Sequence, residues 1–419
     1  MTATISGSQA ALKVLYPDGG MPKSINEMFV LLKRLKKDEG FVGELAYQPV
    51  QNANPQGSGT TVTFGQNSIN QGNYVRFAIS RTKHYGIARV SGEALQAAVK
   101  DEGALVNLWD NETKGVAVTE MSGLATHIYG NGSGSLGAIS SGNAGNVLTM
   151  ATSVNMNYFE LNMLCGAIDA ETITATVRVL GSANGGRVTS IDRRARTLTS
   201  SGAVWNDATK IVALVNTDFL IRAGDGQLSN AATVITGLRE WVVGGTTPGT
   251  LWTLSRNTDP VRLAGQTVDY TGWAMEDAVV DATAQAGFHG IGYPKVVVMN
   301  NLQLADMKKG LGSKISYTRA GGNDGSKGVH GFSGLMIEGE KGPVEVIADP
   351  FCPKNVAYML DLDQFDLFSL KKAPHLQEYD GLRFLRKSDD DVFEVRFAFY
   401  GNLRCKNPGP HLRLTNFGA

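Results

Sequence analysis

The residue types that could carry out catalysis are present, but their spacing does not form a catalytic pattern. Residues 132–137, Gly-Ser-Gly-Ser-Leu-Gly, match the GxGxxG motif of dinucleotide-binding loops. That chemistry requires the loop to follow a strand and open a helix, so that backbone amides face a pyrophosphate. Here the motif follows a predicted helix and leads into predicted strands. We therefore expect a flexible helix exit at this position.

Histidine and cysteine residues do not show the spacing of a metal site or a nucleophilic site. No histidine pairs at i, i+4 with another potential ligand, and the three cysteines are widely spaced without a CxxC motif. No GxSxG elbow and no P-loop are found. We expect no catalytic residue, cofactor or metal, an intracellular reducing environment, and a protein that is not an enzyme. The residues concerned are His84, His127, His289, His330, His375 and His411, with Cys165, Cys352 and Cys405.

Two charged groups leave alternatives open. Asp389–Asp391 is either a solvated turn between two strands or a calcium site. The second group, at the end of a predicted helix, is either a solvated face or a weak contact with nucleic-acid phosphates. It consists of Lys33, Arg34, Lys36 and Lys37.

Charge balance and length limit the class of protein. Lysine plus arginine and aspartate plus glutamate both number 39, which excludes a strongly basic nucleic-acid binder. With 419 residues, 42% of them hydrophobic, the chain can fold into two or three lobes. Its 50 glycines indicate many turns and long loops. No signal peptide and no apolar run of about 18–20 residues is found, so we expect folding in a cytoplasm and no membrane contact.

The first third of the chain contains an unusual uncharged segment. Leu45 to Val75 has no charged residue, and Val75, Phe77 and Ile79 then alternate with Arg76, Ala78 and Ser80. This pattern predicts a long two-stranded loop with an uncharged tip. Such a ribbon is marginally stable alone in water, so we expect it to lie on another surface.

The remaining periodicity predicts an α+β protein. Helices are expected over 24–40, with Ser24 and Glu27 as a capping box, and over 92–99, 104–129, 273–286 and 302–311. Short strands over 173–180, 187–192, 196–199 and 210–215 indicate a small barrel or sandwich inserted in the chain. A buried strand over 295–299 and further strands over 344–347, 356–360, 384–387, 392–400 and 411–414 complete the prediction.

The order of these parts resembles a tailed-bacteriophage major capsid protein of the Hong Kong 97 fold. In Val392–Thr415 a strand leads through Gly401 to a Lys406-Asn407-Pro408 turn and a last apolar strand, which is similar to the end of many such proteins. Pro294–Asn301 and Asp259–Asp269 also resemble segments of that family. The resemblance covers nearly the whole chain, and it rests on the ordered set of motifs.

The resemblance implies a Hong Kong 97-like division of the chain. The expected parts are an N-terminal arm and first helix (1–43), an E-loop lying over a neighbouring subunit (44–90) and a P-domain with a long spine helix (91–145). They continue with an inserted small β-barrel-like domain (146–225), an A-domain at the capsomer axis (226–375) and C-terminal P-domain strands (376–419). Intersubunit contacts are expected from Phe64, Ile69, Tyr74, Arg76 and Phe77 of the E-loop.

The resemblance also implies partners and a location. We expect copies of the chain to self-assemble into the hexamers and pentamers of an icosahedral virion capsid around double-stranded DNA, after synthesis in the host cytoplasm. A scaffolding protein, a portal and a decoration protein are the implied partners, and Lys33, Arg34, Lys36 and Lys37 would face the scaffold or the DNA. The covalent cross-linking of the family is not expected, because the loop tip has no lysine and Lys83 lies near its base.

Two other functions remain open at the level of sequence. An encapsulin nanocompartment has the same fold, although its chains are usually shorter. A β-rich surface-binding protein or adhesin would use the inserted β-domain as its binding site. The mass of the purified protein separates shells from the adhesin, and packaged DNA separates a virion from an encapsulin.

Overall fold

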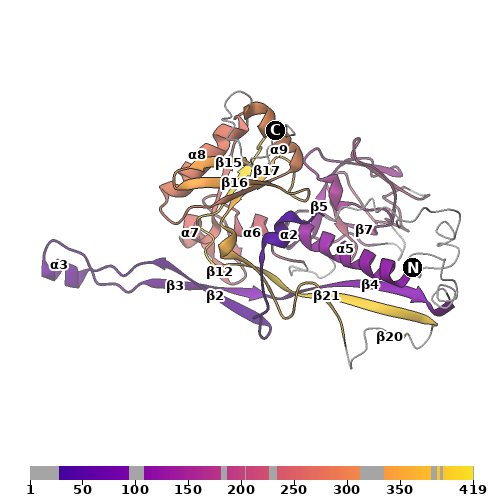
Figure 1. The fold of residues 1–419 in the computed structure, drawn as a ribbon, viewed down its shortest axis with the longest axis horizontal. Coiled ribbons are helices and arrows are strands. Elements are labelled where there is room, and N and C mark those ends of the chain that lie inside the picture. Colours follow the sequence, from indigo (N-terminus) through magenta and orange to yellow (C-terminus); the bar gives the residue numbers. More distant parts are fainter. Residues whose placement is uncertain are drawn as a thin grey trace, which may run out of the picture.

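A computed structural model describes residues 28–93, 108–180, 186–202, 204–225, 234–311, 335–378, 385–386 and 390–418. A long, narrow sheet and a helix lying along it form the spine of the molecule (Figure 1). A two-stranded hairpin projects from one end of this sheet. A mixed sheet with two helices and a second, β-rich part lie on the helix side of the spine.

The spine pairs two strands that are distant in sequence. β4 (Thr82–Ser91) is antiparallel to β21 (Val392–Cys405), and their register runs from Thr82 opposite Gly401 to Ser91 opposite Val392. β18 (Phe365–Ser369), β19 (His375–Leu376) and β20 (Leu385–Arg386) also pair with β21, and β1 (Lys36–Asp38) pairs in parallel with β18.

Helix α5 (Leu108–Ile128) packs closely on this sheet. Its C-terminal half carries the buried side chains of Leu124, Ala125 and Ile128. Gly86 of β4 permits the close approach, because a Cβ there would lie 2.9 Å from Val116 of the helix. The C-terminal half of α5 and strand β21 share one hydrophobic core, to which the strand contributes Phe399 and Leu403.

The projecting hairpin consists of β2 (Leu45–Ala53) and β3 (Asn73–Ser80). A short helix, α3 (Val62–Asn67), forms its tip, and the hydroxyl of Thr61 caps this helix by accepting a hydrogen bond from the Phe64 amide at 3.3 Å. The sequence predicted the two strands and the uncharged tip, but it did not predict a helix at the tip.

An aromatic cluster fixes the root of the hairpin. Phe77 is fully buried, with its ring centroid 5.1 Å from that of Trp241 and 6.4 Å from that of Trp252. Trp252 donates a hydrogen bond to the Ser80 hydroxyl at 3.1 Å, and Asn402 of β21 donates to the Ser80 carbonyl at 2.9 Å. The expected intersubunit contact of Phe77 is therefore wrong, because its side chain belongs to the core of its own chain.

Residues 135–222 contain a six-stranded antiparallel sheet in the order β7-β10-β5-β6-β9-β8. The outer strands meet, since the Cys165 amide donates to the Gly186 carbonyl at 3.1 Å and the Val188 amide to the Met163 carbonyl at 3.0 Å. The sheet thus curls until its two edges touch. Its strands are β5 (Ser135–Ser141), β6 (Val147–Met150), β7 (Cys165–Ile168), β8 (Val188–Asp192), β9 (Thr197–Ser200) and β10 (Phe219–Arg222), with the 3-10 helix η2 (Met156–Tyr158) between β6 and β7.

The second large sheet is mixed and has the order β13-β22-β17-β14-β16-β15. Helices α8 (Met275–Phe288) and α9 (Asn301–Leu311) lie beside it (Figure 1), and α8 buries Ala278, Val279 and Ala282. The strands are β13 (Gln266–Asp269), β14 (Val296–Met299), β15 (Leu335–Gly339), β16 (Gly342–Ala348), β17 (Val356–Leu360) and β22 (Leu412–Thr415). Smaller elements are α2 (Val30–Arg34), α6 (Leu238–Trp241), β11 (Thr250–Leu251), β12 (Leu254–Ser255), η3 (Arg256–Thr258), α7 (Pro260–Ala264) and η5 (Leu362–Gln364).

Several predicted elements differ from the structure. The first helix ends at Arg34 because Leu35 is extended and the chain then pairs as β1; the expected cap at Ser24 and Glu27 lies outside the described residues. Segments 173–180 and 210–215 form single bridges instead of strands, one joining Ile168 to Val177 and another joining Leu180 to Ile211. Most of the helix expected over 92–99 lies outside the described residues.

The predicted boundary between 375 and 376 does not divide the structure. β18, which precedes it, pairs with β21, which follows it. β22, near the C-terminus, pairs with β17 and β13 of the mixed sheet. The last residues therefore cross from the spine sheet to the mixed sheet instead of staying in one part.

We predict that Phe77→Ala destabilises the subunit by about 3–5 kcal/mol, because it empties a fully buried ring position. Tyr74→Ala, three residues away on the exposed part of the same strand, should cost less than about 1 kcal/mol. Urea unfolding of the unassembled subunit measures both free energies. Equal losses in the two variants would show that the aromatic cluster does not anchor the hairpin.

Candidate assembly surfaces

The outer part of the hairpin exposes large apolar side chains. Phe64, Ile69 and Tyr74 are 66%, 71% and 68% exposed. All three come from the uncharged segment 45–75, and Figure 1 shows that the tip lies far from the rest of its own chain. We call Phe64, Ile69 and Tyr74 the hairpin surface. Exposed apolar groups gathered on a projecting element are typical of a surface that binds another protein.

Arg76 lies in the middle of the hairpin and is held by an aromatic contact. Its guanidinium carbon lies 4.5 Å from the centroid of the Tyr47 ring, on the paired strand. Both side chains are exposed. A guanidinium stacked in this way keeps its donors free for a hydrogen-bonding partner. Of the five residues predicted for contacts, four therefore face outward along the hairpin, and Phe77 lies inside.

The four basic residues near the N-terminus do not all lie at the end of one helix, contrary to the prediction. Lys33 and Arg34 end α2, whereas Lys36 and Lys37 lie in β1. All four are exposed, and the buried side chain of Leu35 separates the two pairs. Arg34 binds Glu345 of β16 through two hydrogen bonds of 2.7 and 2.8 Å, and this carboxylate raises the pKa of Arg34. Arg34 is therefore partly neutralised, which leaves three lysines as the basic surface.

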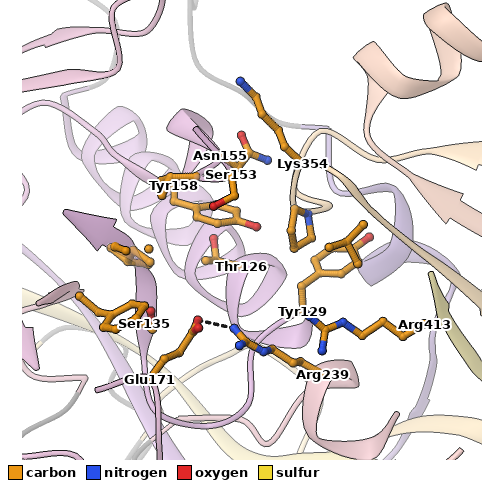
Figure 2. A pocket seen from close by; sticks show the side chains of 18 of the residues that line it. Thr126, Tyr129, Ser135, Ser153, Asn155, Tyr158, Glu171, Arg239, Lys354 and Arg413 are labelled. Atoms are coloured by element: carbon orange, nitrogen blue, oxygen red, sulfur yellow. Dashed lines mark ion pairs between the residues drawn. The ribbon is translucent and has the colours of Figure 1, made fainter. Parts of the chain in front are cut away.

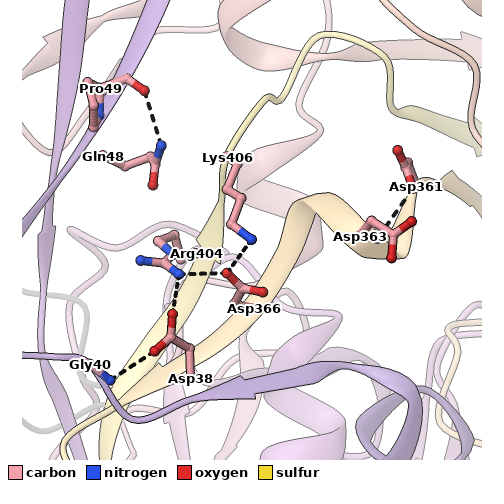
Figure 3. Close-up of polar contacts among 9 residues, drawn as sticks. All are labelled: Asp38, Gly40, Gln48, Pro49, Asp361, Asp363, Asp366, Arg404 and Lys406. Carbon is pink, nitrogen blue, oxygen red and sulfur yellow. Dashed lines mark hydrogen bonds and ion pairs between the residues drawn. The ribbon is translucent and has the colours of Figure 1, made fainter.

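A buried ion-pair network holds β1, and hence this basic surface, in place (Figure 3). Arg404 of β21 contacts Asp38 and the fully buried Asp366, each at 2.6 Å. Lys406 lies 2.9 Å from the same Asp366 oxygen. Burial alone would raise the pKa of Asp38, but hydrogen bonds from the Gly40 amide and Arg404 lower it. The network therefore ties the N-terminal strand to the end of the spine.

A cavity of about 260 Å³ lies at the C-terminal end of α5 (Figure 2). Tyr129, Tyr158 and Arg413 line it. Arg239 and Glu171 also line it and form an ion pair with each other. Burial alone would lower the pKa of Arg239. The attraction of the Glu171 carboxylate outweighs this effect and raises the pKa. The cavity lies between the helix, the curled sheet and the segment before β17. Arg239 and Glu171 pair with each other, and Lys354 and Arg413 add two further cations to its lining.

A second buried polar group was missed by sequence analysis. His84 of β4, Glu120 and His127 of α5, and Asp225 after β10 meet at one point. His84 contacts Glu120 through Nδ1 at 2.7 Å and Asp225 through Nε2 at 3.4 Å, and His127 Nε2 lies 2.9 Å from Asp225. Burial alone would lower the pKa of His84, but the two carboxylates outweigh it and raise the pKa to about 9. Burial alone would raise the pKa of Asp225, but the contacts with His127 and His84 outweigh it and hold this pKa well below its usual range.

The signal for this group was present but incomplete. Glu120 and His127 are seven residues apart, which places both on one side of a helix. The partners on β4 and after β10 are brought to them only by the fold. Searching for ligands four residues apart therefore could not reveal the group.

Comparison with known proteins now identifies the C-terminal half. Residues 213–417 match the family model described as SU10 major capsid protein. This region therefore matches a phage major capsid protein family. The matched capsid-protein region contains the mixed sheet and β21 of the spine, and the resemblance drawn from the sequence is confirmed there.

Solved structures extend the likeness to the whole chain. The chain in a structure described as the cyanophage A-1(L) capsid asymmetric unit is similar over 100% of both chains, with a TM-score of 0.53 and 12% identity. This likeness shows a capsid-type α+β fold. Two weaker likenesses are to the capsid of a native GTA particle (TM-score 0.45, 8% identity, 99% of both chains) and to the SrpI encapsulin of Synechococcus elongatus PCC 7942 (0.44, 6%, 99% of this chain and 96% of that one). No curated protein matches the sequence. The family match over residues 213–417 supports a capsid-forming function.

We predict that Asp366→Ala destabilises the subunit by about 3–5 kcal/mol, because two cations of the network lose their buried partner. Asp363→Ala is the matched control (Figure 3), since the Asp363 side chain is 84% exposed and its loss should change stability by less than about 0.5 kcal/mol. Urea unfolding of the unassembled subunit tests both. If Asp366→Ala unfolds like Asp363→Ala, the network does not hold β1.

Proposed function

We propose that this protein builds the icosahedral head of a tailed phage by self-assembly into hexamers and pentamers around double-stranded DNA. In this proposal β2 and β3 form the E-loop, and α5 with β4 and β21 forms the P-domain and its spine helix. The mixed sheet is the A-domain, and the curled sheet of residues 135–222 is the inserted domain. The protein would have a structural role and no enzymatic activity.

The hairpin surface is the observation that supports this proposal most strongly. A two-stranded ribbon gains little stability from its own contacts, yet this one holds three large apolar side chains in solvent. Uncharged residues on either side of them remove the desolvation cost that charges would add to an interface core. A neighbouring copy of the chain would bury Phe64, Ile69 and Tyr74, and Arg76 would lie at the edge of this contact.

The anchoring of the hairpin fits the same role. The buried ring of Phe77 and the hydrogen bonds to Ser80 hold its root on the spine. The tip is consequently presented at a fixed distance from the subunit that carries it. Every copy would reach the same place on its neighbour, as a closed symmetric shell requires.

The remaining partners follow from assembly around a genome. We infer that a scaffolding protein, a portal and a decoration protein meet this chain during assembly in the host cytoplasm, and that the mature protein resides in the virion. Lys33, Lys36 and Lys37, with Arg34 held by Glu345, would contact the acidic scaffold or the DNA. Because the chain has no net charge, such contacts with DNA would be weak and independent of sequence.

We predict that Ile69→Asp leaves the subunit soluble but prevents or slows shell assembly, because the interface would have to bury an unpaired charge. Ile69→Leu keeps an apolar side chain at the same position and should assemble like the wild type. Sedimentation and electron microscopy of both variants measure the fraction in particles. Normal particles from Ile69→Asp would contradict the role of the hairpin surface.

A paired substitution, Lys33→Glu with Lys36→Glu, tests the basic surface. We expect either failed assembly, which indicates the scaffold, or normal shells that retain less DNA, with a loss that grows as salt rises. The control is Lys308→Glu with Lys309→Glu on α9, which makes the same change of charge elsewhere. Wild-type assembly and DNA content in both pairs would show that the basic residues form only a solvated surface.

A further inference from the structure

The buried group formed by His84, His127 and Asp225 has the composition of a metal site. One ligating atom from each of the three side chains lies within 4.8 Å of the other two. The side chains of His127 and Asp225 are 4% and 7% exposed, and His84 is 15% exposed. The group is thus enclosed, with His84 on the side from which an ion could reach it.

The spacing of these atoms suits a small divalent ion. The Asp225 oxygens lie 3.4 Å from His84 Nε2 and 2.9 Å from His127 Nε2. In a tetrahedral zinc site with metal–nitrogen distances of about 2.0–2.1 Å, neighbouring ligand atoms lie about 3.3 Å apart. Both imidazoles therefore already present one nitrogen to the same carboxylate at nearly the required separation.

Glu120 occupies the position of a residue that orients a ligand. Its carboxylate contacts Nδ1 of His84 at 2.7 Å, so the opposite ring nitrogen, Nε2, points toward Asp225. Metal-bound histidines commonly bind a carboxylate through their second ring nitrogen, which fixes the tautomer and the orientation of the ring. The Glu120 side chain is only 2% exposed, so solvent competes little for this contact.

Glycines allow the three elements to come this close. A Cβ at Gly134 would lie 3.2 Å from the Asp225 Cβ. A Cβ at Gly123 of α5 would lie 3.1 Å from the Arg222 guanidinium and 3.4 Å, an ordinary contact distance, from the His84 ring. Gly134 also has a φ of +80°, which favours glycine. The backbone around the group is therefore shaped for close contact between β4, the helix and the loop after β10.

We propose that His84, His127 and Asp225 bind a divalent transition-metal ion of the zinc type, with Glu120 as a positioning residue. Two imidazoles and one carboxylate suit zinc, cobalt or nickel and do not suit calcium or magnesium, which prefer oxygen ligands. The bound ion would join the spine sheet, α5 and the end of the curled sheet. This site is independent of the hairpin and of the shell geometry proposed above.

Cobalt(II) titration of the purified full-length subunit, after removal of metals with a chelator, tests the site. We expect one ion per chain and the intense visible absorption of a four-coordinate cobalt centre. Zinc should displace the cobalt and remove this absorption. Wild-type protein that binds no ion, or that gives only the weak spectrum of six-coordinate cobalt, would overturn the proposal, and the group would then be a structural ion-pair network.

Variants connect the binding to these residues. His127→Gln and Asp225→Asn should each weaken cobalt binding by at least about 100-fold, and Glu120→Gln by about 10- to 100-fold. The control His289→Gln removes an exposed histidine at the end of α8 and should bind like the wild type. Circular dichroism of the metal-free variants checks their folding. Should His127→Gln or Asp225→Asn fail to fold, Glu120→Gln and the wild-type spectrum decide. Unchanged binding in Glu120→Gln, or a loss in His289→Gln as large as that in Glu120→Gln, would overturn the assignment.

Discussion

The antiparallel pairing of β4 with β21 is the interaction on which the rest of the structure depends. It joins Thr82–Ser91 to Val392–Gly401, so that two segments far apart in the sequence form one sheet. Helix α5 packs along this sheet, and β18 adds the strand to which β1 is paired. The hairpin, the basic surface and the buried histidine group each take their position from one of these three elements.

A projecting hairpin exposes apolar side chains to water when the chain is isolated. In this structure that exposure is greatest in the outer half of the hairpin. At the root, Phe77 and Ile79 are fully buried. Trp241 and Trp252 pack against Phe77 and cover this part of the ribbon, as a second sheet would. Beyond Val75 toward the tip, Arg262 of α7 donates a hydrogen bond to the Asn52 carbonyl, and the side chains of Phe64, Ile69 and Tyr74 are exposed. This division between an anchored root and an unsupported tip is expected if the missing contacts come from another subunit.

Local patterns in the sequence predicted several of the elements. The patterns of apolar residues predicted the hairpin strands, the helix over 108–128, the helix after Trp273 and the strand at Val296–Met299. Long-range contacts decided the rest. Pairing of β1 with β18 ended the first helix early, burial against Trp241 withdrew Phe77 from the surface, and the fold alone brought His84 and Asp225 to His127. Single bridges at Val177 and Ile211 replaced two predicted strands, because the curled sheet already closes through Cys165 and Val188.

Electron cryomicroscopy of the assembled particle tests the central claim most directly, because it locates the hairpin tip relative to every neighbouring copy. The account predicts that Phe64 and Ile69 lie within about 4.5 Å of apolar atoms from an adjacent subunit and lose most of their exposure. It also predicts that Phe77 keeps its contacts with Trp241 of its own chain. A tip that remains in solvent in the intact particle, or that folds back onto the chain that carries it, would contradict the account.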